Sequence, residues 1–237
     1  MLEAKGVTKY FGGMAAVSAV DFIVGRGEIV GLIGPNGAGK TTLFNLISGA
    51  LPLKSGEISF NGQKINGLSP HRICRMGMAR TFQLVKVFNN MSVFQNILLA
   101  SLFGRLKRIA PANAIREAEE LQELLGLSKY STTPARDLTL VNQKRLEVAR
   151  ALATGPELLL LDELMAGLNP TEVTQAMGLV TRIRDNGITV FMIEHVMKAI
   201  MSVCDRIIVL HHGEKIAEGT PGEIAVSKKV IEVYLGE

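Results

Sequence analysis

The sequence predicts an α/β fold in which buried parallel strands form a core that carries an antiparallel β portion and a helical insertion. Short apolar runs have the length and composition of strands that are buried on both faces; they are 29–33, 158–161 and 188–193. Ile58 and Phe60 alternate with polar residues up to Asn61-Gly62, a dipeptide typical of a two-residue β-hairpin. From about residue 86 to 150 the apolar residues recur at helical spacing, which indicates the insertion.

Length and composition favour a globular protein with a substantial core. The chain has 237 residues, enough for one large domain or two smaller ones, and 47% of them are hydrophobic. No apolar run approaches the roughly 20 residues of a membrane-spanning helix, and Glu3 and Lys5 interrupt the pattern of a signal peptide. Cys74 and Cys204 lack metal-ligand spacing and favour a reducing, cytoplasmic location. The net charge of +4 is mild and typical of a solvated surface.

The stretch Gly34–Thr42, GPNGAGKTT, carries the clearest functional signal in the chain. It follows the first apolar run and precedes Leu43, Phe44 and Ile47 at helical spacing, with Gly49 expected at the helix C-cap. A strand, a glycine-rich turn and a helix in this order match the phosphate-binding pattern G-x-x-x-x-G-K-[ST].

Each residue type in this pattern has a chemical reason. Gly37 and Gly39 allow backbone N–H groups to close around phosphate oxygens, and the helix N-terminus adds a partial positive charge. Lys40 can reach the β- and γ-phosphates, and the hydroxyl of Thr41 can ligate Mg²⁺. The stretch therefore predicts a nucleotide site.

The first thirty or so residues are expected to be mostly β-structure, since Val20, Phe22 and Val24 alternate before a glycine-rich turn. Upstream of them, Tyr10 and Phe11 precede two glycines, so one of these aromatic rings is placed to stack on a base. Taken alone, a plain core aromatic explains the pair equally well.

The helical insertion is expected to contain at least two helices. Ser92 can cap the first of them, whose apolar residues are Val93, Ile97, Leu98 and Leu102. The second is expected after Pro111, with one face made of Ile115, Ala118, Leu121 or Gln122, and Leu125. The basic run 105–108 between them is interpreted as a solvated loop.

Polar residues follow two of the apolar runs at the point where each strand is expected to end. Asp162 and Glu163 come directly after one run, and Glu194-His195 come after the next. Because ligands bind at the carboxyl ends of parallel strands, these side chains are expected at one rim. Asp162 can there contact Mg²⁺, and Glu163 can polarise an attacking water. An acidic turn after a buried strand explains the carboxylates equally well when they are considered alone.

Together these motifs resemble the ATP-binding cassettes of ABC transporters, which are P-loop NTPases. The resemblance covers essentially the whole chain and rests on GPNGAGKTT, on LLLLDE at 158–163 and on His195. Within the family, the chain is most similar to the ATP-binding subunits of branched-chain (hydrophobic) amino-acid importers. The strings that carry this finer resemblance are RTFQ at 80–83, AGLNP at 166–170 and FMIEH at 191–195.

The resemblance implies a role for each candidate site residue. Phe11 would stack on adenine, Glu163 would be the catalytic base, and His195 would contact the γ-phosphate. The implied catalytic residues are Lys40, Gln83, Glu163 and His195. The implied Mg²⁺ ligands, in part through water, are Thr41, Gln83 and Asp162. The implied nucleotide-binding residues are Phe11, Gly34, Pro35, Asn36, Gly37, Ala38, Gly39, Lys40, Thr41 and Thr42.

The resemblance also implies an organisation and a set of partners. One ABC ATP-binding domain would span 1–237, with a RecA-like core and the antiparallel β portion at 1–85 and 154–237, and a helical subdomain at 86–153. The segment around 84–104 would face the coupling helices of transmembrane permease subunits. A second ATP-binding subunit and a periplasmic or extracellular substrate-binding protein would complete the transporter, without nucleic acid. The chain would be a peripheral ATPase on the cytoplasmic face of the inner membrane, with ATP and Mg²⁺ as cofactors.

One stretch departs from the family pattern. The signature LSGGQ or LSYGQ reads Leu138-Thr139-Leu140-Val141-Asn142 here. Both glycine positions carry β-carbons, and the β-branched Val141 hinders a close approach of the backbone to a phosphate. Because two cassettes of this family pair head to tail, we expect a heterodimer with a different ATP-binding subunit that has an ordinary signature.

Three other functions stay open. Lipid-type export is one, because other subunits choose the substrate. A non-transport ABC ATPase acting on nucleic acid or ribosomes is another, although such proteins usually carry two cassettes or a long coiled-coil insertion. A regulatory subunit that closes on ATP without hydrolysing it is the third, and the intact Glu163 and His195 speak against it.

Overall fold

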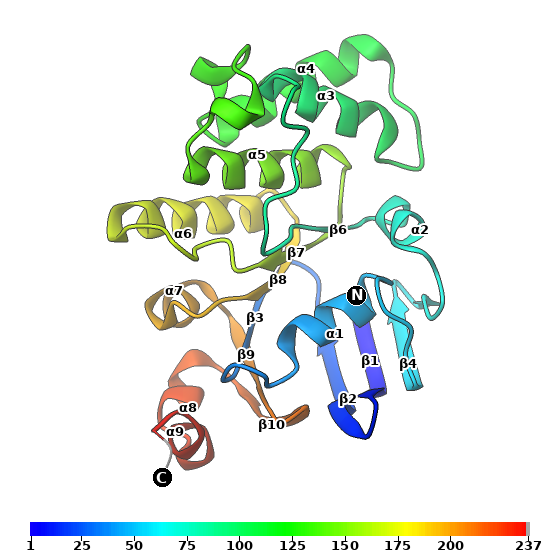
Figure 1. Cartoon of the computed structure of the whole chain (residues 1–237), viewed down its shortest axis with the longest axis vertical. Helices are drawn as coiled ribbons and strands as arrows, with labels where there is room; N and C mark the ends of the chain where they lie inside the picture. Colours follow the sequence, from blue (N-terminus) through cyan, green and yellow to red (C-terminus); the bar gives the residue numbers. More distant parts are fainter. Residues whose placement is uncertain (236–237) are drawn as a thin grey trace.

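Two β-sheets form the centre of the computed structural model, which describes residues 1–235 (Figure 1). The strands of the larger sheet are β3 (Ile29–Ile33), β6 (Met78–Arg80), β7 (Leu158–Asp162), β8 (Thr189–Ile193), β9 (Arg206–His211) and β10 (Glu214–Gly219). Their order across the sheet is β10-β9-β3-β8-β7-β6. The smaller sheet contains β1 (Leu2–Phe11), β2 (Met14–Val24), β4 (Ser55–Phe60) and β5 (Gln63–Lys64), in the order β2-β1-β4-β5.

Helices cover the larger sheet and form a separate group at one end of the molecule (Figure 1). The helices are α1 (Lys40–Ile47), α2 (Pro70–Arg75), α3 (Val93–Phe103), α4 (Pro111–Leu124), α5 (Leu140–Ala153), α6 (Pro170–Asp185), α7 (Met197–Val203), α8 (Pro221–Ala225) and α9 (Lys228–Leu235). Helices α3 and α4 lie farthest from the smaller sheet, and α5 lies between them and α6. Within residues 1–235, no helix combines the length and the apolar character that a membrane crossing requires.

The core of the larger sheet is parallel, as predicted. Strand β3 pairs in parallel with β8 and β9, and β7 pairs in parallel with β6 and β8. Successive side chains point to opposite faces. On one face Ile29, Leu159 and Val190 pack into the helical core. On the other, the neighbouring strand residues Leu160 and Phe191 pack with α1 and the smaller sheet. Because these strands are buried on both faces, their sequences are continuous apolar runs without polar residues in alternation.

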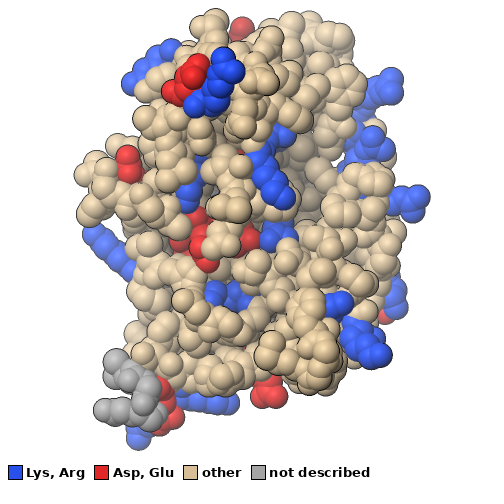
Figure 2. All heavy atoms as spheres, in the orientation of Figure 1, with Lys and Arg blue, Asp and Glu red and all other residues tan. Residues whose placement is uncertain are grey.

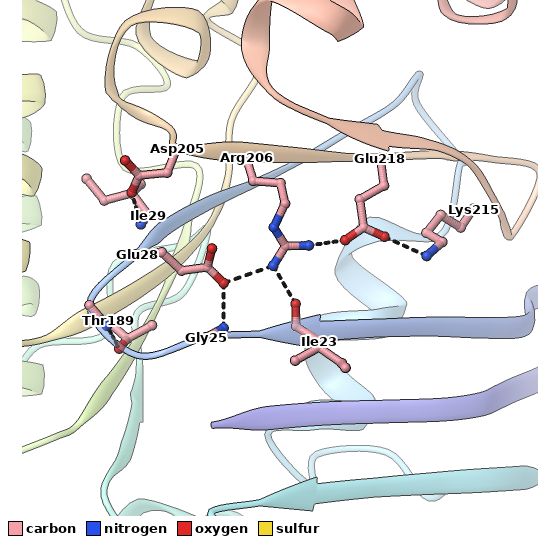
Figure 3. Close-up of polar contacts among 10 residues, drawn as sticks. Ile23, Gly25, Glu28, Ile29, Thr189, Asp205, Arg206, Lys215 and Glu218 are labelled. Atoms are coloured by element: carbon pink, nitrogen blue, oxygen red, sulfur yellow. Dashed lines mark hydrogen bonds and ion pairs between the residues drawn. The ribbon is translucent and has the colours of Figure 1, made fainter.

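The turn between β2 and β3 links the two sheets, and a set of ion pairs fixes it (Figure 3). The guanidinium of Arg206 on β9 donates to the carbonyl oxygen of Ile23 at 2.6 Å and to the Glu28 carboxylate at 2.8 Å. Its other terminal nitrogen pairs with Glu218 on β10, which also accepts from Lys215 at 2.6 Å. These contacts hold the entry to β3, the strand that leads into the predicted phosphate loop.

Two local expectations are confirmed. Ser92 caps α3 in a capping box with Gln95, in which each side chain bonds the other residue's backbone N–H. The predicted hairpin joins β4 to β5, with Phe60 paired to Gln63 across Asn61-Gly62.

Three other local expectations need correction at single residues. On the predicted face of the second helix, Ala118, Gln122 and Leu125 are buried as expected, but Ile115 is 42% exposed and Ala114 is buried in its place. The C-cap of α1 is Ser48, and Gly49 follows it with a φ of 71°. The run 105–108 is a loop, and Leu106, Lys107 and Arg108 are exposed as expected, but the guanidinium of Arg105 pairs with Glu117 at 2.6 Å and is largely buried.

Candidate nucleotide site

Residues 34–39 form the loop that connects β3 to α1. Gly37 and Gly39 have φ angles of 81° and 100°, and a β-carbon on Gly39 would lie 2.3 Å from the carbonyl oxygen of Ala16. Gly39 is also the N-cap of α1 and has no side chain to cap it. The first N–H groups of a helix have no acceptor within the helix, so this turn presents donors to an anion.

Lys40, the first residue of α1, folds back across the loop. Its ammonium group donates to the carbonyl oxygens of Gly34 at 2.7 Å and Pro35 at 2.9 Å. Burial lowers the pKa of Lys40, against the opposing effect of the Glu163 and Asp162 carboxylates. A positive charge is thus already inside the loop where a phosphate would lie.

The loop opens into a cavity of about 530 Å³, whose walls come from both sheets. Phe11, at the end of β1, lines this cavity and is 47% exposed. Tyr10 is similarly exposed, at 44%, but does not line it. The remaining lining residues are Met14, Ala15, Ala16, Asn36, Gly37, Ala38, Gly39, Lys40, Thr41, Thr42, Gln83, Glu163, His195 and His212. The cavity is large enough for a nucleotide with an aromatic ring at one end and the loop at the other.

Three side chains converge at the end of the cavity near the loop. The carboxylate of Glu163 lies 2.7 Å from Nε2 of His195, and its other oxygen accepts from the side-chain amide of Gln83 at 2.9 Å. The three residues follow β7, β8 and β6, so the parallel sheet brings them to one rim. Glu163 has a φ of 53°, and its N–H donates to the carbonyl oxygen of Ile193 at 2.9 Å. A carboxylate held in this way can orient a water molecule and accept its proton.

Asp162 lies one residue earlier, at the end of β7, and has a partner that the sequence reasoning missed. Arg80 donates to one carboxylate oxygen of Asp162 at 2.7 Å in a nearly fully buried ion pair. Arg80 also donates to Asn45 and Ser48 on the α1 side, at 2.7 and 2.9 Å. In the sequence, Arg80 stood out only as the first residue of the string RTFQ, and nothing there pointed to Asp162.

The second oxygen of Asp162 has no hydrogen-bond partner within residues 1–235, although it is buried. A buried carboxylate oxygen of this kind is suited to an ion or to an ion-bound water. Thr41, whose side chain carries a hydroxyl, is among the residues that line the cavity. These two groups fit the hard oxygen ligands that Mg²⁺ prefers.

The substituted signature stretch does not line this cavity. Thr139 is the N-cap of α5, but its hydroxyl makes no capping bond. Leu140 is 51% exposed, whereas Asn142 is buried. Val141 lines a different cavity, between α5 and α6. The phosphate loop and the signature stretch therefore present separate surfaces of the chain.

The comparisons with known proteins bear on this geometry. Residues 17–166, more than half of the chain, match the family model described as ABC transporter. The chain is an ATP-binding cassette of the ABC transporter family. A second model, described as branched-chain amino acid ATP-binding cassette transporter, matches residues 214–237 of the cassette. Over its full length the cassette is 40% identical to the high-affinity branched-chain amino acid transport ATP-binding protein BraF of Pseudomonas aeruginosa, 98% of which is covered.

Solved structures agree with this assignment. A cassette of an ABC transporter in its ADP conformation shares 30% identity with a TM-score of 0.88, over 100% of this chain and 99% of that one. A dimeric cassette in a post-hydrolysis state, bound to ADP and phosphate, shares 25% identity with a TM-score of 0.84, over 93% and 99%. The cassette is therefore an ATP hydrolase.

Proposed function

We propose that the cassette hydrolyses ATP to drive the import of branched-chain amino acids, as a peripheral subunit on the cytoplasmic face of the membrane. The similarity to BraF over the whole chain and the match of residues 214–237 support this substrate class. The observation that carries the hydrolytic role is the carboxylate of Glu163, which is held between His195 and Gln83 on the phosphate-loop cavity.

In this proposal the cavity binds ATP with its base toward Phe11 and its phosphates in the loop. The N–H groups at Gly37 and Gly39 and the ammonium of Lys40 hold the phosphate oxygens, and the dipole of α1 adds to their attraction. Lys40 exchanges its present bonds to the loop carbonyls for bonds to phosphate, which is a charge-assisted and stronger interaction.

Thr41, Asp162 and Gln83 would hold Mg²⁺, Asp162 through water. When bound, the ion neutralises charge on the β- and γ-phosphates. The unpartnered oxygen of Asp162 supports this assignment, since the other oxygen is already taken by Arg80.

Glu163 orients a water molecule for attack on the γ-phosphorus and takes up its proton as ADP leaves. His195 lies against the same carboxylate and is placed to contact the γ-phosphate. Gln83, which follows β6, donates to the carboxylate of Glu163. The segment between β6 and the helical group would therefore move when the contacts of this carboxylate change during hydrolysis. Movement of that group would carry the signal to the membrane subunits.

We further propose that the working unit is a heterodimer with a different cassette, in a transporter that also includes a substrate-binding protein. A homodimer would place Leu140 and Val141 against the γ-phosphate in both sites, whereas a heterodimer would do so in only one. Leu140, at the start of α5, is exposed and therefore accessible to a partner subunit. The dimeric structure of a related cassette supports the pairing itself.

A groove beside α3 is the surface that we assign to the permease. It has a volume of about 410 Å³, and Phe82, Phe88 and Phe103 contribute to its walls. Phe103 at its rim is 63% exposed. Figure 2 shows Lys and Arg side chains along the edge formed by α2 and the α3–α4 connection; exposed basic residues of these segments are Arg72, Arg75, Lys107 and Arg108. An apolar groove beside a basic edge suits a permease segment at an anionic membrane surface.

The test is transport by the cassette reconstituted with its partner subunits in proteoliposomes. ATP-dependent accumulation of leucine, isoleucine or valine is expected, together with ATP hydrolysis that the substrate-loaded binding protein stimulates. Outward movement of lipid under the same conditions, with no amino-acid uptake, would contradict the proposal.

A further inference from the structure

Lys144 on α5 is a buried lysine that faces the segment carrying Glu163. The side chain is only 6% exposed. Its ammonium group donates to three backbone carbonyls, those of Glu163 at 3.0 Å, Leu164 at 3.0 Å and Ala166 at 2.7 Å. All three donor positions of the ammonium group are therefore used on one short loop.

The opposite side of this loop is held by a buried carboxylate. Glu194, which follows β8, accepts from the N–H of Met165 at 2.8 Å and is 2% exposed. Burial raises the pKa of Glu194 to about 7 and lowers the pKa of Lys144, as expected of a site from which water is largely excluded. Residues 163–166 thus lie between a cation from α5 and a carboxyl group from the end of β8.

Glu163 requires such support because of its backbone conformation. A φ of 53° is unfavourable for a residue with a β-carbon, unless the surrounding structure enforces it. The side-chain contact with His195 provides little enforcement, because His195 is itself 43% exposed on its side chain. The hydrogen bonds on the backbone of the loop fix the direction in which the carboxylate leaves the chain.

We propose that Lys144 is a positioning residue for ATP hydrolysis, which holds the carbonyl groups of Glu163, Leu164 and Ala166 and thereby aims the carboxylate of Glu163 into the phosphate-loop cavity. The inference rests on the proposed role of Glu163 as the base. Without the ammonium group, the carbonyls of Leu164 and Ala166 lose this donor and that of Glu163 keeps only its bond from the Ala166 N–H at 3.3 Å, so the loop relaxes to satisfy them. The base then spends less time in its working geometry, while the phosphate loop is unchanged.

The neighbouring residue supplies a matched control. Arg145 lies on the same helix, but its guanidinium donates to Gln175 on α6 at 2.6 Å, an exposed contact. In the reconstituted transporter, Lys144→Met is expected to lower kcat about 10- to 100-fold, as misplacement of a reacting group does. The KM for ATP should change less than about threefold, because the binding groups stay in place. Arg145→Met should keep kcat within about twofold of the wild type, and Lys144→Arg should recover much of the loss, since it restores a buried cationic donor.

A double variant separates positioning from general stabilisation. In single-turnover hydrolysis, adding Lys144→Met to Glu163→Gln should slow the residual rate no further, because the group that Lys144 positions has already been disabled. An equal slowing in both backgrounds would overturn the inference and leave Lys144 a structural residue. If Lys144→Met does not fold, Lys144→Gln replaces it, with the same comparison and a smaller expected loss of kcat.

The outcomes also distinguish this inference from the proposed function. Wild-type kcat in Lys144→Met, beside an inactive Glu163→Gln, would overturn the positioning role alone. Wild-type kcat in Glu163→Gln would instead remove the base on which the inference rests.

Discussion

Phe11 and Tyr10 stand side by side at the end of β1 with nearly equal exposure, but only Phe11 lines the cavity that contains the phosphate loop. Comparing the two residues can therefore distinguish an aromatic ring that stacks on the base from one that is merely exposed at the surface. At the other end of the cavity Lys40 already occupies the loop through its bonds to Gly34 and Pro35. The two ends contribute to nucleotide binding in different ways, by contact with a π-face and by charge.

Phe11→Ala is expected to weaken ATP binding by about 1–2 kcal/mol, the range for losing one base–aromatic stack. That corresponds to roughly a 5- to 30-fold higher Kd in a calorimetric titration. Because stacking reads the face of a base and not its edge, the preference between ATP and GTP should change little. Tyr10→Ala is the control and should leave the Kd unchanged. The opposite pattern in the two variants would transfer the stacking role to Tyr10.

At the scale of elements, the ends of β7 and β8 determine the geometry of the site. Parallel register places Asp162 beside Ile193, so the residues that follow the two strands meet at one edge. Glu194 follows β8 and turns inward to bond Met165, whereas His195, one residue later, turns toward the cavity. One strand end thus supplies both a group that holds the loop and a group that faces the nucleotide.

Glu194 should make stability depend on pH. Its pKa in the folded protein is about 7, mainly because burial disfavours the carboxylate, against 4.5 as the ordinary value. Between these two values the folded state binds more protons than the unfolded state, so the free energy of unfolding falls as pH rises through this window. In Glu194→Gln, the free energy of unfolding should decline less with pH, with a difference from the wild type on the order of 1–3 kcal/mol between pH 4.5 and 7. Urea unfolding at a series of pH values measures it, and parallel curves for variant and wild type would contradict the assignment.

The sequence was sufficient to predict elements whose pattern is local. Ile29–Ile33 and the strand ending at Asp162 are visible as apolar runs, and the cap at Ser92 directly precedes the helix that it begins. Contacts that depend on the tertiary arrangement were missed. Arg80 meets Asp162 across 82 positions of the chain, and Lys144 meets its loop across about 20.

Neither pairing has a spacing that a sequence pattern could reveal. The error at Ile115 has a related cause, because α4 has apolar residues on more than one side and only its contacts with neighbouring helices select the buried stripe. The roles of the site residues likewise stay predictions, since geometry brings the side chains together without showing the reaction.

At the scale of the whole molecule, the proposed dimer would build each nucleotide site from two unlike halves. The phosphate loop, Glu163 and His195 form one half around a common cavity. In the proposal the other half is Thr139 to Asn142 at the start of α5, which lacks the glycines of the family signature that permit close approach to a phosphate. Loss of backbone N–H contacts to a developing charge could cost roughly 3–4 kcal/mol, or a hundredfold or more in rate.

An asymmetric transporter is therefore expected. Replacing the catalytic glutamate of the partner cassette by glutamine should leave most of the ATP hydrolysis, because that glutamate works against the substituted signature of this chain. Steady-state hydrolysis by the assembled transporter is the measurement. Equal losses from the partner variant and from Glu163→Gln, or full activity of this chain alone, would contradict the asymmetry.

The most direct test of the account is the Glu163→Gln variant in the reconstituted importer, followed by ATP binding, ATP hydrolysis and leucine uptake on the same preparation. Glutamine keeps the size and one acceptor oxygen of the side chain but cannot take up the proton. We expect ATP binding close to that of the wild type, with hydrolysis and uptake both reduced at least a hundredfold. Hydrolysis at the wild-type rate, with uptake intact, would show that Glu163 is not the base.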